Sequence, residues 1–212
     1  MRKVKIWDLS TRLYHWAQAL IFFGLMATGI TSNGPHVQLG LALFTLIVWR
    51  ILWGLVGSET NRFSQFVRNP LNTVRYALGK STPYIGHNPL GAFMVITMLT
   101  TLLVQCLTGM MLAGLFDGLE AYGLIIPDAL YEISEEVHIL LADLLPIIIA
   151  THVGAIVIYK IFGKGLLKAM ITGYQSLDFN QSVPVLSSQI KALLVLIFAI
   201  LVTMTIVATS NM

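Results

Sequence analysis

Two histidines within one apolar segment suggest the chemistry of this chain. His138 and His152 lie 14 positions apart, and most residues between them are Ile or Leu. Fourteen helical residues rise about 21 Å, most of the ~30 Å hydrocarbon core of a bilayer. At about 100° per residue, the two imidazoles return to within about 40° of one face. One helix would thus offer a nitrogen ligand near each side of a membrane, which suits two haems and an electron path between them.

The composition predicts an integral membrane protein. Of the 212 residues, 56% are hydrophobic and 11% are charged, against about 25% charged residues in soluble domains. The length suits a single membrane domain over residues 1–212, and no nucleic-acid-binding motif is present. The single cysteine, Cys106, excludes an intrachain disulfide, a cysteine-ligated iron–sulfur cluster and covalent haem attachment. Any haem would be held non-covalently, with histidine as the leading ligand type.

Five apolar segments must position these histidines. They lie at about 13–30, 36–57, 90–113, 138–161 and 187–209. Each is close to the ~20 residues that a membrane-spanning helix needs. The first segment follows basic residues, as a signal peptide does, but we expect it to be retained because it carries His15. The sequence therefore predicts an all-α membrane protein with five spans.

The charged residues predict its orientation. All 13 Lys and Arg fall in the N-terminal tail, in 58–89, in 160–191 or in the adjoining helix ends. The stretch 114–143 contains only acidic charges. The positive-inside rule then places the N-terminus in the cytoplasm and the C-terminus in the periplasm.

This topology gives four histidines a depth. His15 and His152 lie toward the inner side, and His36 and His138 lie toward the outer side. Pairing by depth joins His15 to His152 and His36 to His138, each pair from two helices, as bis-histidine haem ligation requires. Two imidazoles per level, without thiolates or clustered carboxylates, make a poor zinc site. The alternative that the histidines only bond neighbouring helices stays open.

A haem also needs partners for its propionates and space for its ring. The propionates are anionic, and Arg12 and Arg50 are the leading partners at the inner haem, followed by Lys160 and Arg75. Positive-inside anchoring is the alternative for each of them. Gly40 can supply space one turn into the second span. Further glycine candidates are Gly24, Gly29, Gly109, Gly114 and Gly154.

Several motifs are distributed between residues 6 and 172. They read IWDLSTRLYHW from Ile6, VWRILWG from Val48, RFS from Arg62, YIGHNPLGA from Tyr84, EEVH from Glu135 and THV from Thr151. Together they make the chain resemble the bacterial cytochrome b561 and nickel-iron hydrogenase b-type cytochrome family. The resemblance implies a four-helix bundle holding two b haems, plus a fifth, C-terminal transmembrane helix, in the bacterial cytoplasmic (inner) membrane.

The resemblance also implies ligands and partners. It assigns the inner haem to His15 and His152 and the outer haem to His36 and His138, the same pairs that depth predicts. It implies electron transport in a respiratory chain between membrane quinone and a periplasmic redox protein, a c-type cytochrome or a hydrogenase. The remaining histidine, His87, lies in a Gly-His-Asn-Pro turn. We expect His87 and Arg75, with Arg12, to serve a quinone or to support the inner haem, with a structural turn as the alternative for His87.

Other functions stay open. The chain could be the cytochrome b membrane anchor of a nickel-iron hydrogenase, or a superoxide:quinone oxidoreductase, which needs no protein partner. A haemless metal or proton transporter is the alternative from another class, although the inverted repeats common in transporters are not visible. The acidic segment 117–136 could dock a basic partner or be a solvated face. Membrane lipid is an expected partner, and a homodimer is left open.

Overall fold

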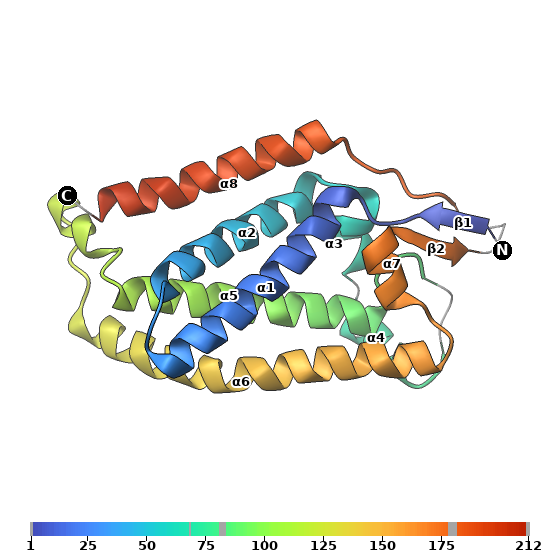
Figure 1. Cartoon of the computed structure of the whole chain (residues 1–212), viewed down its shortest axis with the longest axis horizontal. Helices are drawn as coiled ribbons and strands as arrows, with labels where there is room; N and C mark the ends of the chain where they lie inside the picture. The colour runs from blue at the N-terminus through green and yellow to red at the C-terminus, as the bar shows by residue number, and fades with distance from the viewer. Residues whose placement is uncertain (1, 68, 81–83, 178–181, 211–212) are drawn as a thin grey trace.

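Five long helices dominate the computed structural model, which describes residues 2–67, 69–80, 84–177 and 182–210 (Figure 1). All five are long and apolar enough to cross a membrane. They are α1 (Leu9–Thr31), α2 (His36–Val56), α5 (Pro89–Leu112), α6 (Asp128–Ile161) and α8 (Gln189–Thr209). The helical membrane fold predicted from the apolar segments is confirmed. The helix containing His138 and His152 starts ten residues before the apolar segment, at Asp128.

Short elements gather at the two ends of the bundle. One end carries a two-stranded antiparallel sheet of β1 (Arg2–Lys5) and β2 (Tyr174–Leu177), which the sequence did not predict, and we call it the sheet end. The opposite end, called the acidic end, carries the 3-10 helix η2 (Asp117–Tyr122) and the start of α6. The remaining short elements are η1 (Glu59–Asn61), α3 (Phe63–Phe66), α4 (Pro70–Ala77) and α7 (Leu166–Thr172).

Side-chain caps begin three of the long helices. Asp8 accepts a hydrogen bond from the Thr11 amide at the start of α1, at 2.6 Å. Asn88 does the same for Gly91 at the start of α5, where Pro89 takes the first helical position. Ser188 caps α8. Such caps satisfy amides that have no partner within the helix, so these residues fix where each helix starts.

The helices form a four-helix core with α8 outside it (Figure 1). In the core, α6 packs on α5, α5 on α2, and α2 on α1. Apolar side chains from all four helices, including Phe22, Leu43, Leu102 and Leu145, fill the middle of the bundle. Outside it, α8 packs along α2, where the Trp49 indole donates to the Ala192 carbonyl at 3.1 Å.

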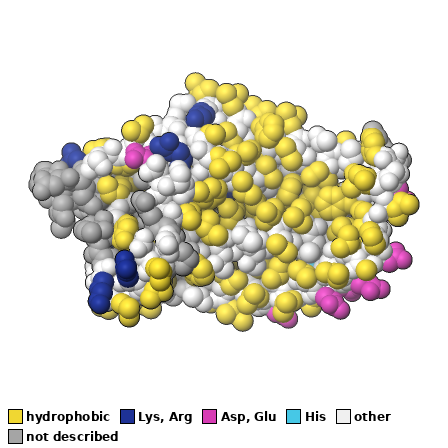
Figure 2. Space-filling model, turned by 180° about the vertical axis from the view of Figure 1, so that it is seen from behind, with side chains coloured by type: hydrophobic (Ala, Val, Ile, Leu, Met, Phe, Trp, Pro, Cys, Tyr) yellow, Lys and Arg dark blue, Asp and Glu magenta, His cyan; other side chains and the backbone are white. Residues whose placement is uncertain are grey.

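The surface divides into an apolar middle and charged ends. Figure 2 shows hydrophobic side chains across the middle, Lys and Arg toward the sheet end, and most acidic side chains at the acidic end. A hydrophobic belt between two polar ends is the surface that a bilayer requires of a helical bundle. The chain is therefore a multi-pass membrane protein.

Candidate functional site

The structure brings one pair of histidines together at the acidic end of the bundle. His36 begins α2 and His138 lies in α6, and their ring centres are 6.4 Å apart with the planes at 80°. A second pair lies toward the sheet end. His15 of α1 faces His152 of α6, also at 6.4 Å, with the planes at 51°. These are the two pairs that the depth argument predicts, and α6 contributes a histidine to each.

The ring separations fit an iron between two imidazoles. Each iron–nitrogen bond spans about 2.0 Å, and each nitrogen lies roughly 1.1 Å from its ring centre, so the centres should be about 6.2 Å apart. Among the described residues, no group of three His, Cys, Asp or Glu side chains comes close enough together to hold a metal ion. Two facing imidazoles at this separation could hold the iron of a haem between them.

A cavity of about 610 Å³ surrounds the His36–His138 pair. Residues of α1, α2, α5 and α6 line it, among them Phe22, Gly40 and Leu102. Its volume lies within the ~300–1,000 Å³ usual for cofactor sites, and its walls are mainly apolar. A Cβ added at Gly40 would meet no atom within 4 Å. The cavity can therefore accept an apolar macrocycle next to the pair.

The histidines at the acidic end are anchored through one ring nitrogen. His36 Nδ1 lies 2.9 Å from Thr28 Oγ1. His138 Nδ1 lies 3.1 Å from both the Gln105 carbonyl oxygen and Thr108 Oγ1. In each ring, Nε2 is the nitrogen left for a metal. At the sheet end, His15 Nδ1 is buried and has no hydrogen-bond partner in the described part of the chain.

The two arginines predicted to hold propionates lie near the sheet end. Arg12 donates to the Ile171 carbonyl at 2.5 Å, and its Nε is buried without a partner among the described residues. Arg50 is buried, with its guanidinium 3.4 Å from the Asn61 carbonyl and 5.1 Å from the centre of the Phe63 ring. Arg50 is thus enclosed by backbone and aromatic groups. The further candidates Lys160 and Arg75 are exposed on α6 and α4.

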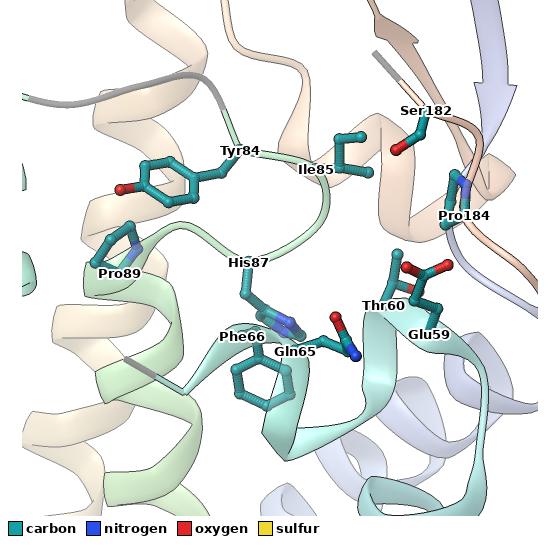
Figure 3. Close-up of a pocket in the computed structure, with 10 residues that line it drawn as sticks. All are labelled: Glu59, Thr60, Gln65, Phe66, Tyr84, Ile85, His87, Pro89, Ser182 and Pro184. Carbon is teal, nitrogen blue, oxygen red and sulfur yellow. The ribbon is translucent and has the colours of Figure 1, made fainter. Parts of the chain in front are cut away.

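His87 lies apart from both pairs, in the loop before α5. Its ring packs 4.5 Å from that of Phe66 and 4.8 Å from that of Trp7. It lines a cavity of about 310 Å³ together with Gln65 and Tyr84 (Figure 3). Burial, and to a smaller extent the nearby Arg50 cation, lower the pKa of His87 to about 3. The imidazole is therefore neutral at pH 7.

A neutral, buried His87 makes stability depend on pH. Its pKa is lower in the folded protein than in the unfolded chain, so the unfolded chain binds the extra proton between about pH 6.5 and 3. We expect the thermal unfolding midpoint in detergent to fall as the pH is lowered from 7 to 4.5, and to fall less in His87→Asn. Equal slopes for the two proteins would contradict a buried, neutral imidazole.

Three structurally important side chains were missed by the sequence analysis. Asp8 is fully buried, and its carboxylate accepts hydrogen bonds from the Thr11 amide, Trp53 Nε1, Ser58 Oγ and Asn61 Nδ2. Thr28 and Thr108 hold the two histidine rings at the acidic end. Only a local signal was available for each: an acidic residue at a helix start, and a threonine followed by glycine in an apolar segment.

A bundle of apolar helices with facing histidines defines a class, the membrane b-type cytochromes, which transfer electrons through haem. The chain belongs to the prokaryotic cytochrome b561 family, whose sequence model matches residues 6–173. It is similar to a probable Ni/Fe-hydrogenase B-type cytochrome subunit of Bradyrhizobium diazoefficiens, with 26% identity over 151 residues. That match covers 56% of this chain and 61% of the relative, so the chain spans about three fifths of its length. No solved structure matches. The family predicted from the motifs is confirmed.

Proposed function

We propose that this chain is a single membrane domain that carries electrons through two b haems across the bacterial cytoplasmic membrane. His15 and His152 would bind the haem at the sheet end, and His36 and His138 the haem at the acidic end. The observation that carries the proposal is the equal 6.4 Å separation of the two ring pairs, which share one helix. Each haem would supply one-electron chemistry and would be held by two histidines, which suits electron transfer rather than substrate binding at the iron.

The charge distribution supports the direction in which the bundle crosses the membrane. Basic side chains gather toward the sheet end and acidic ones at the opposite end (Figure 2). By the positive-inside rule, the sheet end and N-terminus face the cytoplasm, and the acidic end and C-terminus face the periplasm. The His15–His152 pair is then the inner site, and the His36–His138 pair is the outer site.

Arg12 is the residue best placed to hold a propionate at the inner site. It lies one helical turn before His15 in α1, so both side chains project toward the same side of the helix. Its buried Nε has no partner among the described residues, and a carboxylate would satisfy it. The contacts of Arg50 with Asn61 and Phe63 instead leave it a role in the packing behind the site.

Electrons would enter or leave at the inner side through membrane quinone. Of the predicted candidates, His87 has a cavity beside it and a buried Nδ1 that finds no hydrogen-bond partner among the residues the structure describes, whereas Arg75 is exposed. A neutral imidazole can accept a hydrogen bond from a quinol hydroxyl and so position the quinol while its electrons pass to the inner haem. The periplasmic partner would exchange electrons at the outer haem.

Quinol added to vesicles that contain the holoprotein tests the quinone step. We expect quinol to reduce the b haems, and His87→Ala to slow this reduction at least tenfold while dithionite still reduces both haems. Glu59→Gln, which lines the same cavity without a ring nitrogen, is the matched control. Failure of quinol to reduce the unmodified protein would refute the quinone proposal.

A hydrogenase is the second candidate as partner. The observation that favours it is the similarity to a protein described as a probable Ni/Fe-hydrogenase B-type cytochrome subunit. As such an anchor, the chain would receive electrons at its periplasmic end and deliver them to quinone. Co-purification with hydrogenase subunits would support this role. Electron exchange with a c-type cytochrome, without any bound hydrogenase subunit, would favour a c-type cytochrome as the partner.

Salt should weaken docking at the acidic end if a basic partner binds there. Exposed carboxylates of Glu132, Glu135 and Glu136 lie on the first turns of α6. We expect electron exchange with a basic c-type cytochrome to slow several-fold when the salt concentration is raised from about 20 to about 200 mM. The added salt shortens the Debye length to below about 10 Å and so screens the attraction between the two proteins. The double variant Glu132→Gln/Glu135→Gln should flatten the dependence, and Lys80→Gln at the sheet end should not. A rate independent of salt would contradict electrostatic docking.

A further inference from the structure

The same dipeptide occurs beside both histidines of the outer pair. Thr28-Gly29 lies in α1, and Thr108-Gly109 lies in α5. In each case the threonine hydroxyl reaches Nδ1 of a histidine on the next long helix, His36 on α2 or His138 on α6. The glycine that follows lies against the same ring. Two helices far apart in sequence thus present the outer histidines in the same way.

The threonine hydroxyls act as acceptors toward these rings. Thr28 Oγ1 lies 2.9 Å from the Gly24 carbonyl, and Thr108 Oγ1 lies 2.9 Å from the Val104 carbonyl. Each hydroxyl hydrogen can therefore point to a backbone carbonyl one turn earlier, which leaves the oxygen lone pairs facing the imidazole. Nδ1 must then carry the ring hydrogen, and Nε2 presents its lone pair. This is the tautomer that binds a metal through Nε2.

The glycines leave room for the rings, one more tightly than the other. A Cβ added at Gly109 would lie 2.8 Å from Cε1 of His138, closer than two carbon atoms can pack. A Cβ added at Gly29 would lie 3.4 Å from Cε1 of His36, which is ordinary contact. Gly109 is therefore required by the ring position, whereas an alanine at position 29 fits.

The inner pair has no comparable support in the described part of the chain. His15 Nδ1 is buried without a partner, and no hydrogen bond to a His152 ring nitrogen is found among the described residues. The outer pair is thus distinguished by its hydrogen bonds as well as by its position. A hydrogen bond from Nδ1 makes an imidazole a stronger donor to the metal, which stabilises the more oxidised iron.

We propose that Thr28, Thr108 and Gly109 are positioning residues for the outer haem. The threonines fix the orientation and tautomer of His36 and His138 and lower the reduction potential of that haem, and Gly109 leaves room for the His138 ring. The proposal rests on the proposed function, since it takes His36 and His138 as the ligands. The threonines act through the histidines and do not touch the iron.

Redox titration of the purified holoprotein, followed in the visible spectrum, tests this proposal. In Thr28→Val and Thr108→Val, the midpoint potential of the outer haem should rise, and that of the inner haem should stay constant. Thr28→Ser keeps a hydroxyl and should restore the original potential. Thr205→Val, whose hydroxyl bonds only the Leu201 carbonyl among the described residues, is the matched control. Gly109→Ala should lower the occupancy of the outer haem, and Gly29→Ala should not.

The failures of the two proposals are distinguishable. The outer haem is identified as the one that His36→Ala loses. If His36→Ala keeps both haems, the ligand assignment falls, and the threonine proposal falls with it. If His36→Ala loses one haem but both valine variants leave the potential of that haem unchanged, the ligand assignment is supported and the threonine proposal is overturned. If a valine variant loses the outer haem entirely, the midpoint potential of that haem is compared between Thr28→Ser and Thr28→Ala instead.

Discussion

Replacing His36 or His138 with alanine is expected to remove one haem from each chain and leave the other with an unchanged spectrum. The two rings lie 6.4 Å apart across the outer cavity, and each would supply one of the two protein ligands that hold the haem. His15→Ala and His152→Ala should remove the other haem by the same mechanism. Haem per protein, measured by a pyridine haemochrome assay, should fall from two to one in each of the four variants.

The double variants provide the stricter comparison. His36→Ala/His138→Ala should resemble either single variant, because both residues serve one site, whereas His36→Ala/His152→Ala should lose both haems. His87→Ala is the matched control, since His87 packs against Trp7 and Phe66, away from both pairs, and it should keep two haems. A His36→Ala/His152→Ala protein that still binds one haem would contradict the pairing.

Asp8→Ala is expected to cause the largest loss of stability. The buried carboxylate caps α1 and accepts hydrogen bonds from Trp53, Ser58 and Asn61, which connect α1 to α2 and to the segment after it. Alanine removes the cap and leaves these donors buried without a partner. We expect a loss of about 3–5 kcal/mol in the free energy of unfolding. Denaturant titration in detergent, followed by tryptophan fluorescence, would measure it.

A variant of a neighbouring serine tests whether any side chain lost from the first turn of α1 lowers stability as much as the loss of Asp8. Ser10 lies in the same turn of α1, and its side chain bonds Gln189 at the surface. Ser10→Ala should lose less than about 1 kcal/mol. The loss of stability in Asp8→Asn should lie between those of Asp8→Ala and Ser10→Ala. The amide oxygen of the asparagine can still accept a hydrogen bond, whereas its amide nitrogen faces other donors. Equal losses in Asp8→Ala and Ser10→Ala would show that the carboxylate does not connect the helices.

The pairing of the histidines could be predicted because it depends on depth alone. Charge asymmetry orders the apolar segments across the membrane, and the 14-residue interval within one helix sets two levels. His15 and His36 then have one partner each at the right level. Side-chain rotation matters little for this prediction, since a helix rigidly fixes the height of each residue.

The supporting contacts could not be predicted, because they join residues far apart in the chain. Asp8 meets Ser58 and Asn61 across 50 or more positions, and Thr108 meets His138 across 30. Such contacts depend on how the helices are rotated about their axes, which apolar segments of nearly uniform hydrophobicity do not specify. The small sheet was missed because its two strands, Arg2–Lys5 and Tyr174–Leu177, are far apart in the sequence.

The haem content of the purified, unmodified protein tests the central claim most directly. A reduced-minus-oxidised visible spectrum, combined with the pyridine haemochrome assay and a protein determination, gives the kind and the number of haems. Two non-covalent, low-spin b haems per chain are expected from the His15–His152 and His36–His138 pairs. A single haem per chain, or a high-spin spectrum with an open axial position, would contradict two bis-histidine sites.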